Sequence, residues 1–194
     1  LISGAIFLRS SFAAATADPG VRTSDTVVVG IPNEPRRVAL LQALNADSSV
    51  TAMAASSPRT RAVLEGSADT PGLAVDQIAV SPEYFDVLDI AVVSGRAFTQ
   101  AERTADSGVA VVTANVARRL WPNRDAVGQI VRVHEGSAGT PPPSPLAFSV
   151  VGVVRDVKTV FLDEVGVYLP TSPERPGTSL TLRVRGDLEQ ARQA

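Results

Sequence analysis

Short apolar runs rich in valine recur along the chain and predict β-strands. A branched Cβ fits a pleated sheet better than a helix, and a continuous apolar run is typical of a buried strand. Near the end of the chain, Leu180, Leu182 and Val184 alternate with polar residues, which predicts one face on the core and one face in water. The predicted strands are residues 26–31, 50–55, 73–80, 109–112, 129–134, 148–157, 165–169 and 180–184.

A first helix is predicted after Glu34-Pro35. Proline is favoured at the first helical position, and an acid is favoured near the positive end of the helix dipole. The apolar stripe of this helix comprises Val38, Leu41 and Leu44. Arg36 and Arg37 lie off the stripe, so we expect both side chains in solvent.

Other helix signals lie between the strands. Ser81-Pro82-Glu83 combines a serine cap, a proline and an acid in the first turn. Thr99 and Glu102 have the spacing of a capping box, which predicts a short polar helix. Thr113 is expected to cap a helix that Pro122 ends, and a last helix is expected from residue 186. About eight strands interleaved with about five short helices predict an α+β (mixed α/β) fold.

Two long breaks separate groups of predicted elements. Residues 56–71 contain charges, Gly66 and Pro71, and we expect most of this segment to be loop. Residues 135–147 are rich in glycine, proline and serine, which is typical of an exposed, mobile loop. The strands that flank this second break are expected to pair as a hairpin.

The chain begins with eight apolar or small residues, followed by Arg9. Eight residues cannot cross a bilayer, which needs about 20, and a signal peptide would have a basic region before its apolar part. Two interpretations remain open. Residues 1–8 are the end of a membrane helix, with Arg9 at the exit to water, or they form an ordinary N-terminal helix packed on the domain.

Composition narrows the possible functions. The length of 194 residues allows one domain or two small ones. The 18 basic and 20 acidic side chains nearly balance, which argues against a nucleic-acid groove with its basic stripe. The absence of cysteine excludes thiolate chemistry, disulfides and cysteine-based zinc sites. Valine occurs 28 times and alanine 27 times, and 17 of the 18 basic residues are arginine. This bias fits a GC-rich genome better than an anion-binding role.

Candidate catalytic residues are few. His134 is the only histidine, and the chain has no G-x-S-x-G, H-E-x-x-H, G-x-x-x-x-G-K-[ST] or G-x-G-x-x-G motif. Asp86 and Asp89 lie three residues apart, and Asp163 and Glu164 are adjacent. Paired carboxylates perform acid–base work in some enzymes, but they more often solvate a surface. These residues alone therefore predict no enzyme.

Aromatic and basic pairs have simple structural explanations. Trp121 and the pair Tyr84-Phe85 are residue types that line ligand pockets, but their helical spacing favours core positions. The pairs Arg36-Arg37 and Arg118-Arg119 are expected on solvated helix faces.

Four motifs in order carry a resemblance to a known family. The motifs are residues 80–88 (VSPEYFDVL) with 94–99 (SGRAFT), residues 111–122 (VVTANVARRLWP) with 125–128 (DAVG), residues 148–157 (FSVVGVVRDV) and residues 167–170 (VYLP). These segments resemble the periplasmic core domain of MacB/FtsX-type ABC transporter permeases, of the long permease branch. The start of the chain (residues 8–10 and 18–20) is similar to the exit of that branch's first transmembrane helix. The family has a Pro-Gly turn where Ser48-Ser49 stands here, and residues 135–147 look like an insertion.

The resemblance implies a domain of two parts. A porter-like two-layer sandwich subdomain would come from residues 21–60 and 160–194, with a sabre-like mixed α/β subdomain inserted at residues 61–159. Residues 1–20 would be the end of a transmembrane helix and its exit segment. The motif positions, expected to be structural, are Tyr84, Phe85, Gly95, Arg96, Phe98, Trp121, Pro122, Gly128, Gly152, Tyr168 and Pro170.

The resemblance also implies a function. The domain would lie on the periplasmic side of the inner membrane, hold no catalytic residues, metal or cofactor, and serve transmembrane transport such as efflux. ATP would be used by a separate cytoplasmic ATP-binding subunit or domain. The implied partners are the transmembrane helices of the same permease, that ATP-binding subunit and a periplasmic adaptor protein, with a dimer of the full-length protein left open and no nucleic acid.

Two rival functions remain. The first is a stand-alone periplasmic module that binds a ligand or peptide. The second is a hydrolase that uses Asp86, Asp89 or His134.

Overall fold

A computed structural model describes residues 25–31, 34–66, 71–135, 145–157 and 165–185, and these residues form an α+β fold. The part of the chain that is described contains ten strands, three α-helices and two short 3-10 helices. In chain order they are β1 (Thr26–Val29), η1 (Glu34–Arg36), α2 (Arg37–Ala46), β2 (Val50–Ser56), β3 (Thr60–Glu65), β4 (Leu73–Val80), α3 (Tyr84–Val87), β5 (Val92–Gly95), η2 (Ala105–Ser107), β6 (Val109–Thr113), α4 (Ala114–Leu120), β7 (Ile130–Glu135), β8 (Leu146–Val154), β9 (Val165–Pro170) and β10 (Ser179–Val184).

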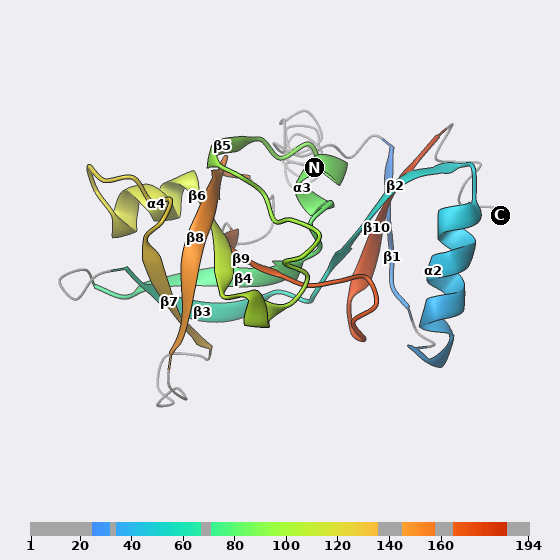
Figure 1. The fold of residues 1–194 in the computed structure, drawn as a ribbon, viewed down its shortest axis with the longest axis horizontal. Coiled ribbons are helices and arrows are strands. Elements are labelled where there is room, and N and C mark those ends of the chain that lie inside the picture. The colour runs from blue at the N-terminus through green and yellow to red at the C-terminus, as the bar shows by residue number, and fades with distance from the viewer. Residues whose placement is uncertain (1–24, 32–33, 67–70, 136–144, 158–164, 186–194) are drawn as a thin grey trace, which may run out of the picture.

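The strands form two regions along the long axis of the molecule (Figure 1). In the first, here called the small region, β10 lies between β1 and β2 and runs antiparallel to both. The helix α2 lies between β1 and β2 in the chain, which makes a split β-α-β unit. In the second, here called the ring region, six strands pair in the order β4-β3-β7-β8-β6-β9, and β9 closes the ring by pairing with β4.

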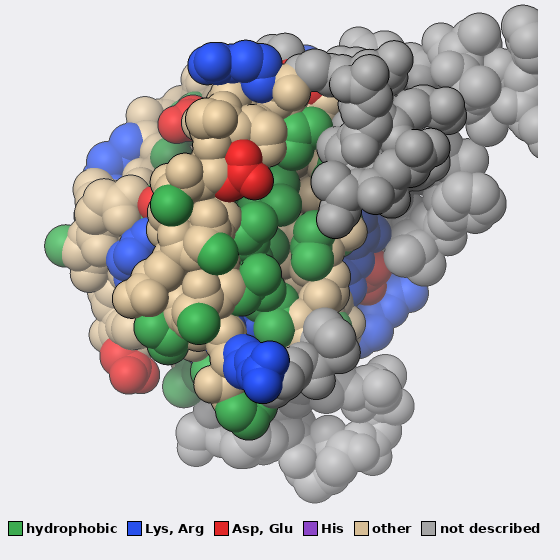
Figure 2. Space-filling view, turned by 90° about the vertical axis from the view of Figure 1, so that its right-hand side faces the viewer, with side chains coloured by type: hydrophobic (Ala, Val, Ile, Leu, Met, Phe, Trp, Pro, Cys, Tyr) green, Lys and Arg blue, Asp and Glu red, His purple; other side chains and the backbone are tan. Residues whose placement is uncertain are grey.

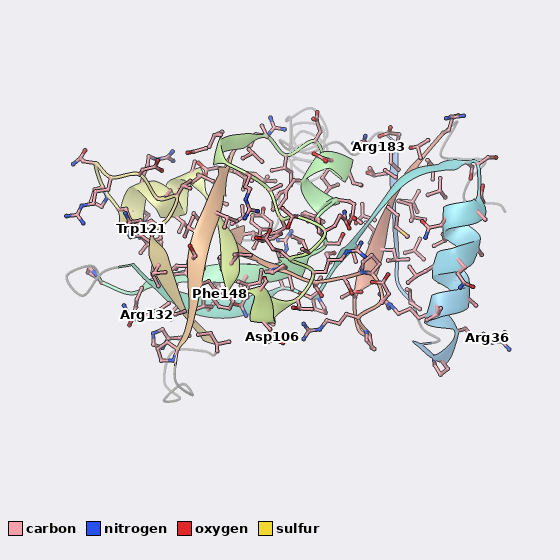
Figure 3. The ribbon with its side chains drawn as sticks, in the orientation of Figure 1. Arg36, Asp106, Trp121, Arg132, Phe148 and Arg183 are labelled. Carbon is pink, nitrogen blue, oxygen red and sulfur yellow. The ribbon has the colours of Figure 1, made fainter. Side chains whose placement is uncertain are left out.

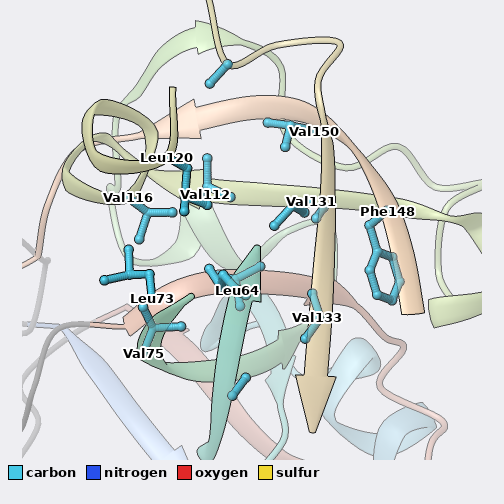
Figure 4. Packing of buried hydrophobic residues seen from close by; sticks show 14 of the residues in the cluster. Leu64, Leu73, Val75, Val112, Val116, Leu120, Val131, Val133, Phe148 and Val150 are labelled. Atoms are coloured by element: carbon cyan, nitrogen blue, oxygen red, sulfur yellow. The ribbon is translucent and has the colours of Figure 1, made fainter. Parts of the chain in front are cut away.

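Three clusters of buried apolar side chains form the cores of these regions. The largest takes residues from all six ring strands and from α4, and Figure 4 shows how they interdigitate, with Leu64 and Val112 among them. A second cluster covers the opposite face of β4, β6 and β9 beneath α3. All six residues of β9 are buried because this strand contributes to both clusters. The third and smallest cluster lies between α2 and the strands of the small region.

All eight predicted strands are confirmed, and the hairpin of β7 and β8 forms as expected. The expectation of loop over residues 56–71 is wrong, because β3 occupies Thr60–Glu65. Ala62 and Leu64 of β3 point into the ring core, while the charged residues that suggested a loop lie on its outer face. There Arg61 Nε lies 3.2 Å from Asp76 Oδ1. The short strand β5 was also not predicted.

The solvent face predicted for α2 is wrong at two positions. Arg37 is 2% exposed, whereas Val38 is 61% exposed. The helix begins at Arg37, so Arg37, Leu41 and Leu44 share the inner face at i, i+4 and i+7, and Val38 is turned outward. Figure 2 shows this end of the molecule, with hydrophobic side chains at its centre and charged ones toward its rim.

Hydrogen bonds compensate the burial of Arg37. Its Nε donates to Pro173 O (2.6 Å) and its Nη2 donates to Thr178 O (2.9 Å) and to the Thr178 hydroxyl. A buried charge is tolerated when it is hydrogen-bonded in this way. Arg37 therefore ties α2 to the connection between β9 and β10.

The helix signals have different outcomes. Thr113 caps α4 as predicted, since its hydroxyl accepts from the Val116 N–H. Ser81 is not a cap, because α3 begins at Tyr84 and the Ser81 hydroxyl bonds to another strand. At Thr99 only the carboxylate half of a capping box forms: Glu102 Oε2 accepts from the Thr99 N–H (2.8 Å). The short helix after it is the 3-10 turn η2.

Several predictions fall outside the described residues. These are the membrane-helix end at residues 1–20, most of the loop at 135–147, the last helix, and the pair Asp163-Glu164. None of the described helices has both the length and the apolar character needed to cross a membrane. The division into residues 21–60 plus 160–194 and an insert at 61–159 stays a prediction, although β9 pairs within the ring region.

Candidate functional site: the junction between the two regions

The two regions are joined in the sheet by one residue pair. Ser56 at the end of β2 lies opposite Val80 at the end of β4. Every other strand pair of the ring or of the small region contains at least two residue pairs. The backbone connection is therefore narrow at this point.

Two serine side chains extend this connection on either side of the pair. The Ser57 N–H donates to Ala79 O (2.8 Å), and the Ala79 N–H donates to Ser57 Oγ (2.9 Å). In the same way the Ser81 N–H donates to Ala55 O (2.9 Å), and the Ala55 N–H donates to Ser81 Oγ (3.0 Å). The hydroxyls thus take the place of ladder carbonyls, and buried N–H groups stay satisfied.

Helix α3 bridges the junction, because it contacts β2 and β10 of the small region and carries Phe85 into the core of the ring region. The Arg183 side chain of β10 reaches the end of this helix, where its Nη2 donates to Asp86 O (2.6 Å) and Val87 O (2.7 Å). Carbonyls at a helix C-terminus lack partners within the helix, and arginine commonly satisfies them. Figure 3 labels Arg183 beside the small region.

The start of α3 is held from the ring side. Glu83 Oε1 accepts from Gln100 Nε2 (2.7 Å) and from Arg103 Nη2 (3.1 Å). Burial alone would raise the pKa of Glu83. Its hydrogen bonds, among them the one from Gln100, and the charge of Arg103 together have the larger effect, so the pKa of Glu83 is lowered. Arg103 also lies 3.9 Å from Glu174 in the connection between β9 and β10.

Four of the predicted motif residues meet in one aromatic cluster under α3. The ring of Phe85 lies 5.1 Å from that of Tyr168 and 6.0 Å from that of Phe98, and Tyr84 lies 6.2 Å from Tyr168. These spacings are typical of favourable aromatic pairs. Burial raises the pKa of Tyr168 and of Tyr84. The pattern of residues 80–88 and 167–170 therefore builds a core rather than a binding cleft.

The glycines of two motifs allow a close backbone approach. Gly95 of β5 lies opposite Gly152 of β8. A Cβ at Gly152 would overlap the carbonyl oxygen of Arg96, and one at Gly95, whose φ is +69°, would overlap that of Val151. Gly152 also adjoins a register shift between β6 and β8. The close approach of these backbones thus explains why both motif positions are glycine.

Arg96 has a structural partner. Its guanidinium binds both oxygens of Glu102, at 2.7 and 2.8 Å. This bidentate hydrogen bonding, together with bonds from Thr99, lowers the pKa of Glu102 to about 2. The G-R-A-F-T segment is therefore a folded turn, in which Phe98 enters the aromatic cluster.

The remaining motif residues lie elsewhere. Trp121 is buried at the end of α4 against Gly66, and Pro122 beside it is exposed. Both line a cavity of about 410 Å³, with Arg118 and Arg124 at it. Gly128 has a φ of +85° in the turn before β7. Pro170 ends β9 opposite Val80.

Among the described candidates for catalysis, His134 lies apart from the two aspartates Asp86 and Asp89. His134 Nε2 lies 3.2 Å from Glu65 Oε2 on the outer face of the ring. Asp86 and Asp89 are exposed at the end of α3. The described residues contain no group of three or more histidine, aspartate or glutamate side chains that could hold a metal ion. Arg118 and Arg119 are exposed as expected, and Arg118 pairs with Asp156 (3.1 Å).

Sequence patterns did not indicate the residues that hold the junction. Arg183 looked like any outward residue of a half-buried strand, and Arg103 and Ser57 lie in segments expected to be loop or polar helix. An arginine such as Arg183 can donate to the free carbonyls at the end of a short helix. The sequence does not show which helix lies beside Arg183, because that depends on the fold.

The comparison with protein families decides which class of domain this is. The model of the MacB-like periplasmic core domain matches residues 5–194. The chain belongs to this family. Its fold is that of the periplasmic region of MacB from Actinobacillus actinomycetemcomitans, with a TM-score of 0.64, 15% identity, and coverage of 93% of this chain and 85% of that one. The extracellular domain of the ABC-type transporter YknZ from Gram-positive bacteria is also similar, with a TM-score of 0.58, 17% identity and 87% of each chain covered.

Curated relatives are longer than this MacB-like domain. The macrolide export ATP-binding/permease protein MacB 1 of Yersinia pestis bv. Antiqua (strain Antiqua) is 32% identical over 122 residues, which cover 62% of this chain and 17% of that protein. The protein of the same name from Yersinia pseudotuberculosis serotype I (strain IP32953) has the same values. The match spans less than a fifth of these relatives.

Proposed function

We propose that this MacB-like domain is the extracytoplasmic part of an ABC-type permease in the inner membrane, lying on the periplasmic side. The family match over residues 5–194 carries this proposal. Relatives named as macrolide export ATP-binding/permease proteins support it, since they contain a segment like this one within a longer chain.

The domain acts without catalysis or a cofactor of its own, and a separate nucleotide-binding domain or subunit hydrolyses ATP. In support, Arg96 and Glu83 are engaged in ion pairs and the aromatic residues Phe85, Phe98 and Tyr168 are core. The transmembrane helices of the same permease and a periplasmic adaptor are its proposed contacts, and a dimer of the full protein is compatible with them. Motion reaches the domain through stiff elements rather than through a reactive group.

Labelling of a single cysteine tests the location. Ala147 is exposed on β8, and this chain has no cysteine of its own. In a full-length protein whose other cysteines are replaced, Ala147→Cys should react with a membrane-impermeant maleimide in spheroplasts. A cysteine in the ATP-binding part should react only after lysis. Reaction of Ala147→Cys only after lysis would contradict the proposal.

A stand-alone binding module is the second candidate, favoured by the cavity of about 410 Å³ beside Trp121. The two candidates differ in where the full-length protein is found. A permease stays with the membrane fraction after a carbonate wash, whereas a binding module is recovered in the periplasmic extract.

A further inference from the structure

Three features of the junction point to a mechanical role for α3. The sheet connection between the small region and the ring region consists of the Ser56–Val80 pair and of the hydrogen bonds that Ser57 and Ser81 make on either side of it. A connection of this kind resists bending weakly, because few hydrogen bonds cross it. Contacts beside it must therefore help to fix the angle between the regions, and α3 contacts both.

Helix α3 contacts both regions: it lies against β2 and β10 of the small region, and its side chains pack into the ring region. It has four residues, too few to be stable alone. Phe85 packs against Phe98 and Tyr168, and Glu83 at the start of the helix binds Gln100 and Arg103. The carbonyls at its C-terminal end accept hydrogen bonds from the Arg183 side chain of the small region.

An irregularity in the neighbouring strand β2 lies beside Arg183. The register between β10 and β2 shifts between Arg183 and Val184, which leaves Thr51 as an extra residue in β2. The Thr51 hydroxyl donates to Arg183 O (3.1 Å) and holds the backbone there. A bulge bends the strand that carries it and increases the local twist, so the sheet beside Arg183 departs from regular geometry.

Arg183 does not use all of its hydrogen-bond donors in this contact. Its Nη2 donates to two carbonyls, but its Nε is buried and has no hydrogen-bond partner among the described residues. An unsatisfied buried donor lowers the benefit of the bound state. The contact is therefore weaker than one in which every buried donor of Arg183 is satisfied.

We propose that Arg183 and α3 form a clasp that fixes the angle between the two regions, and that opening the clasp lets the small region turn about the Ser56–Val80 connection. In the permease this clasp would pass motion from one region to the other, a part of the inference that rests on the proposed function. Arg183 is then a positioning residue, acting through α3.

The distance between spin labels on the two regions tests the clasp directly. Ala43 on α2 and Ala147 on β8 are both exposed, and the absence of native cysteine makes Ala43→Cys with Ala147→Cys a specific label pair. In the parent chain, pulsed electron–electron double resonance should give one narrow distribution of distances between the two spin labels. Arg183→Gln should replace it with a broad one or add a second maximum.

The matched control is Arg185→Gln, since Arg185 is exposed just beyond β10 and should leave the distribution narrow. An unchanged distribution in a folded Arg183→Gln chain overturns the clasp. If Arg183→Gln does not fold, as judged by circular dichroism, Arg183→Lys is measured instead. Lysine keeps the charge but lacks the planar guanidinium group. A broadened distance distribution in Arg183→Lys would support the clasp, and an unchanged one would overturn it. The result is independent of the labelling in spheroplasts, which reports the proposed function alone.

Discussion

The ring region and the small region reach stability by different routes. Each of the six ring strands pairs on both sides, and their main cluster has seventeen buried apolar residues. In the described part of the small region, β1 is an edge strand that pairs on one side. The cluster of this region has four buried members: Leu41, Ala55, Leu180 and Leu182. The small region relies in addition on two arginines, since the buried Arg37 and the half-buried Arg183 tie it to neighbouring segments. A closed sheet makes its own core, whereas a small open sheet needs polar anchors.

The largest expected effect is in the ring core. Leu64 is fully buried, so Leu64→Ala should lower the free energy of unfolding by about 3 kcal/mol, through lost burial and the cavity left behind. The matched change Leu41→Ala in the small region should cost less, about 2 kcal/mol, because fewer buried neighbours surround it. Urea unfolding of both variants measures the difference. Equal losses would remove the distinction between the regions.

Removing the buried anchor should have the next largest effect. Arg37→Met keeps an apolar stem but leaves Pro173 O and Thr178 O without their donor, which should cost about 2 kcal/mol of unfolding free energy. Arg36→Met is the control, since Arg36 is exposed. Thermal unfolding followed by circular dichroism compares them. A loss at Arg37 no greater than at Arg36 would show that the anchor carries no stability.

Acid should weaken the turn that follows β5. The pKa of Glu102 falls from 4.5 to about 2 on folding, so its contribution is complete above pH 4.5 and is lost as the pH falls toward 2. Since the Arg96 side chain is 48% exposed, screening holds this contribution to about 1 kcal/mol. Urea unfolding at several pH values should show a smaller loss below pH 4.5 in Glu102→Gln. If the unfolding free energy of the parent chain and of Glu102→Gln fell equally with pH, the Arg96–Glu102 pair would have no such role.

The smallest effect is expected at Val38, which the apolar stripe of α2 placed inside. Because Val38 is 61% exposed, Val38→Thr should change the unfolding free energy by less than about 0.5 kcal/mol. The same urea series used for Leu41→Ala measures it. A loss as large as that of Leu41→Ala would restore the predicted stripe and reject the observed orientation of the helix.

The sequence predicted those parts of the fold whose signals are local. The apolar runs of β4, β8 and β9 identify these strands because burial on the core demands apolar residues, and Thr113 marks the start of α4 by its own side-chain chemistry. β3 escaped prediction because its outer residues are charged and pair with neighbouring strands. Its burial depends on the closure of the ring, which no window of sequence contains.

The candidate site was predictable in part. The motif residues Phe85, Phe98 and Tyr168 were recognised and they meet in one cluster. Arg37 and Arg183 were expected in water, since a charged side chain usually lies there. Their roles depend on carbonyls supplied by segments more than ninety residues away in the chain, and partners at that distance follow from the fold alone.

Native-state hydrogen exchange along a urea series tests most directly whether the molecule consists of two unequal regions joined by a clasp. Amides of β1, β2, β10 and α2 should open together at lower urea than those of the ring strands, because the small region buries fewer apolar residues. The amides of Val87 and Leu88, bonded within α3, should open with the ring. Exchange of both regions in one step, or of α3 together with the small region, would contradict the account.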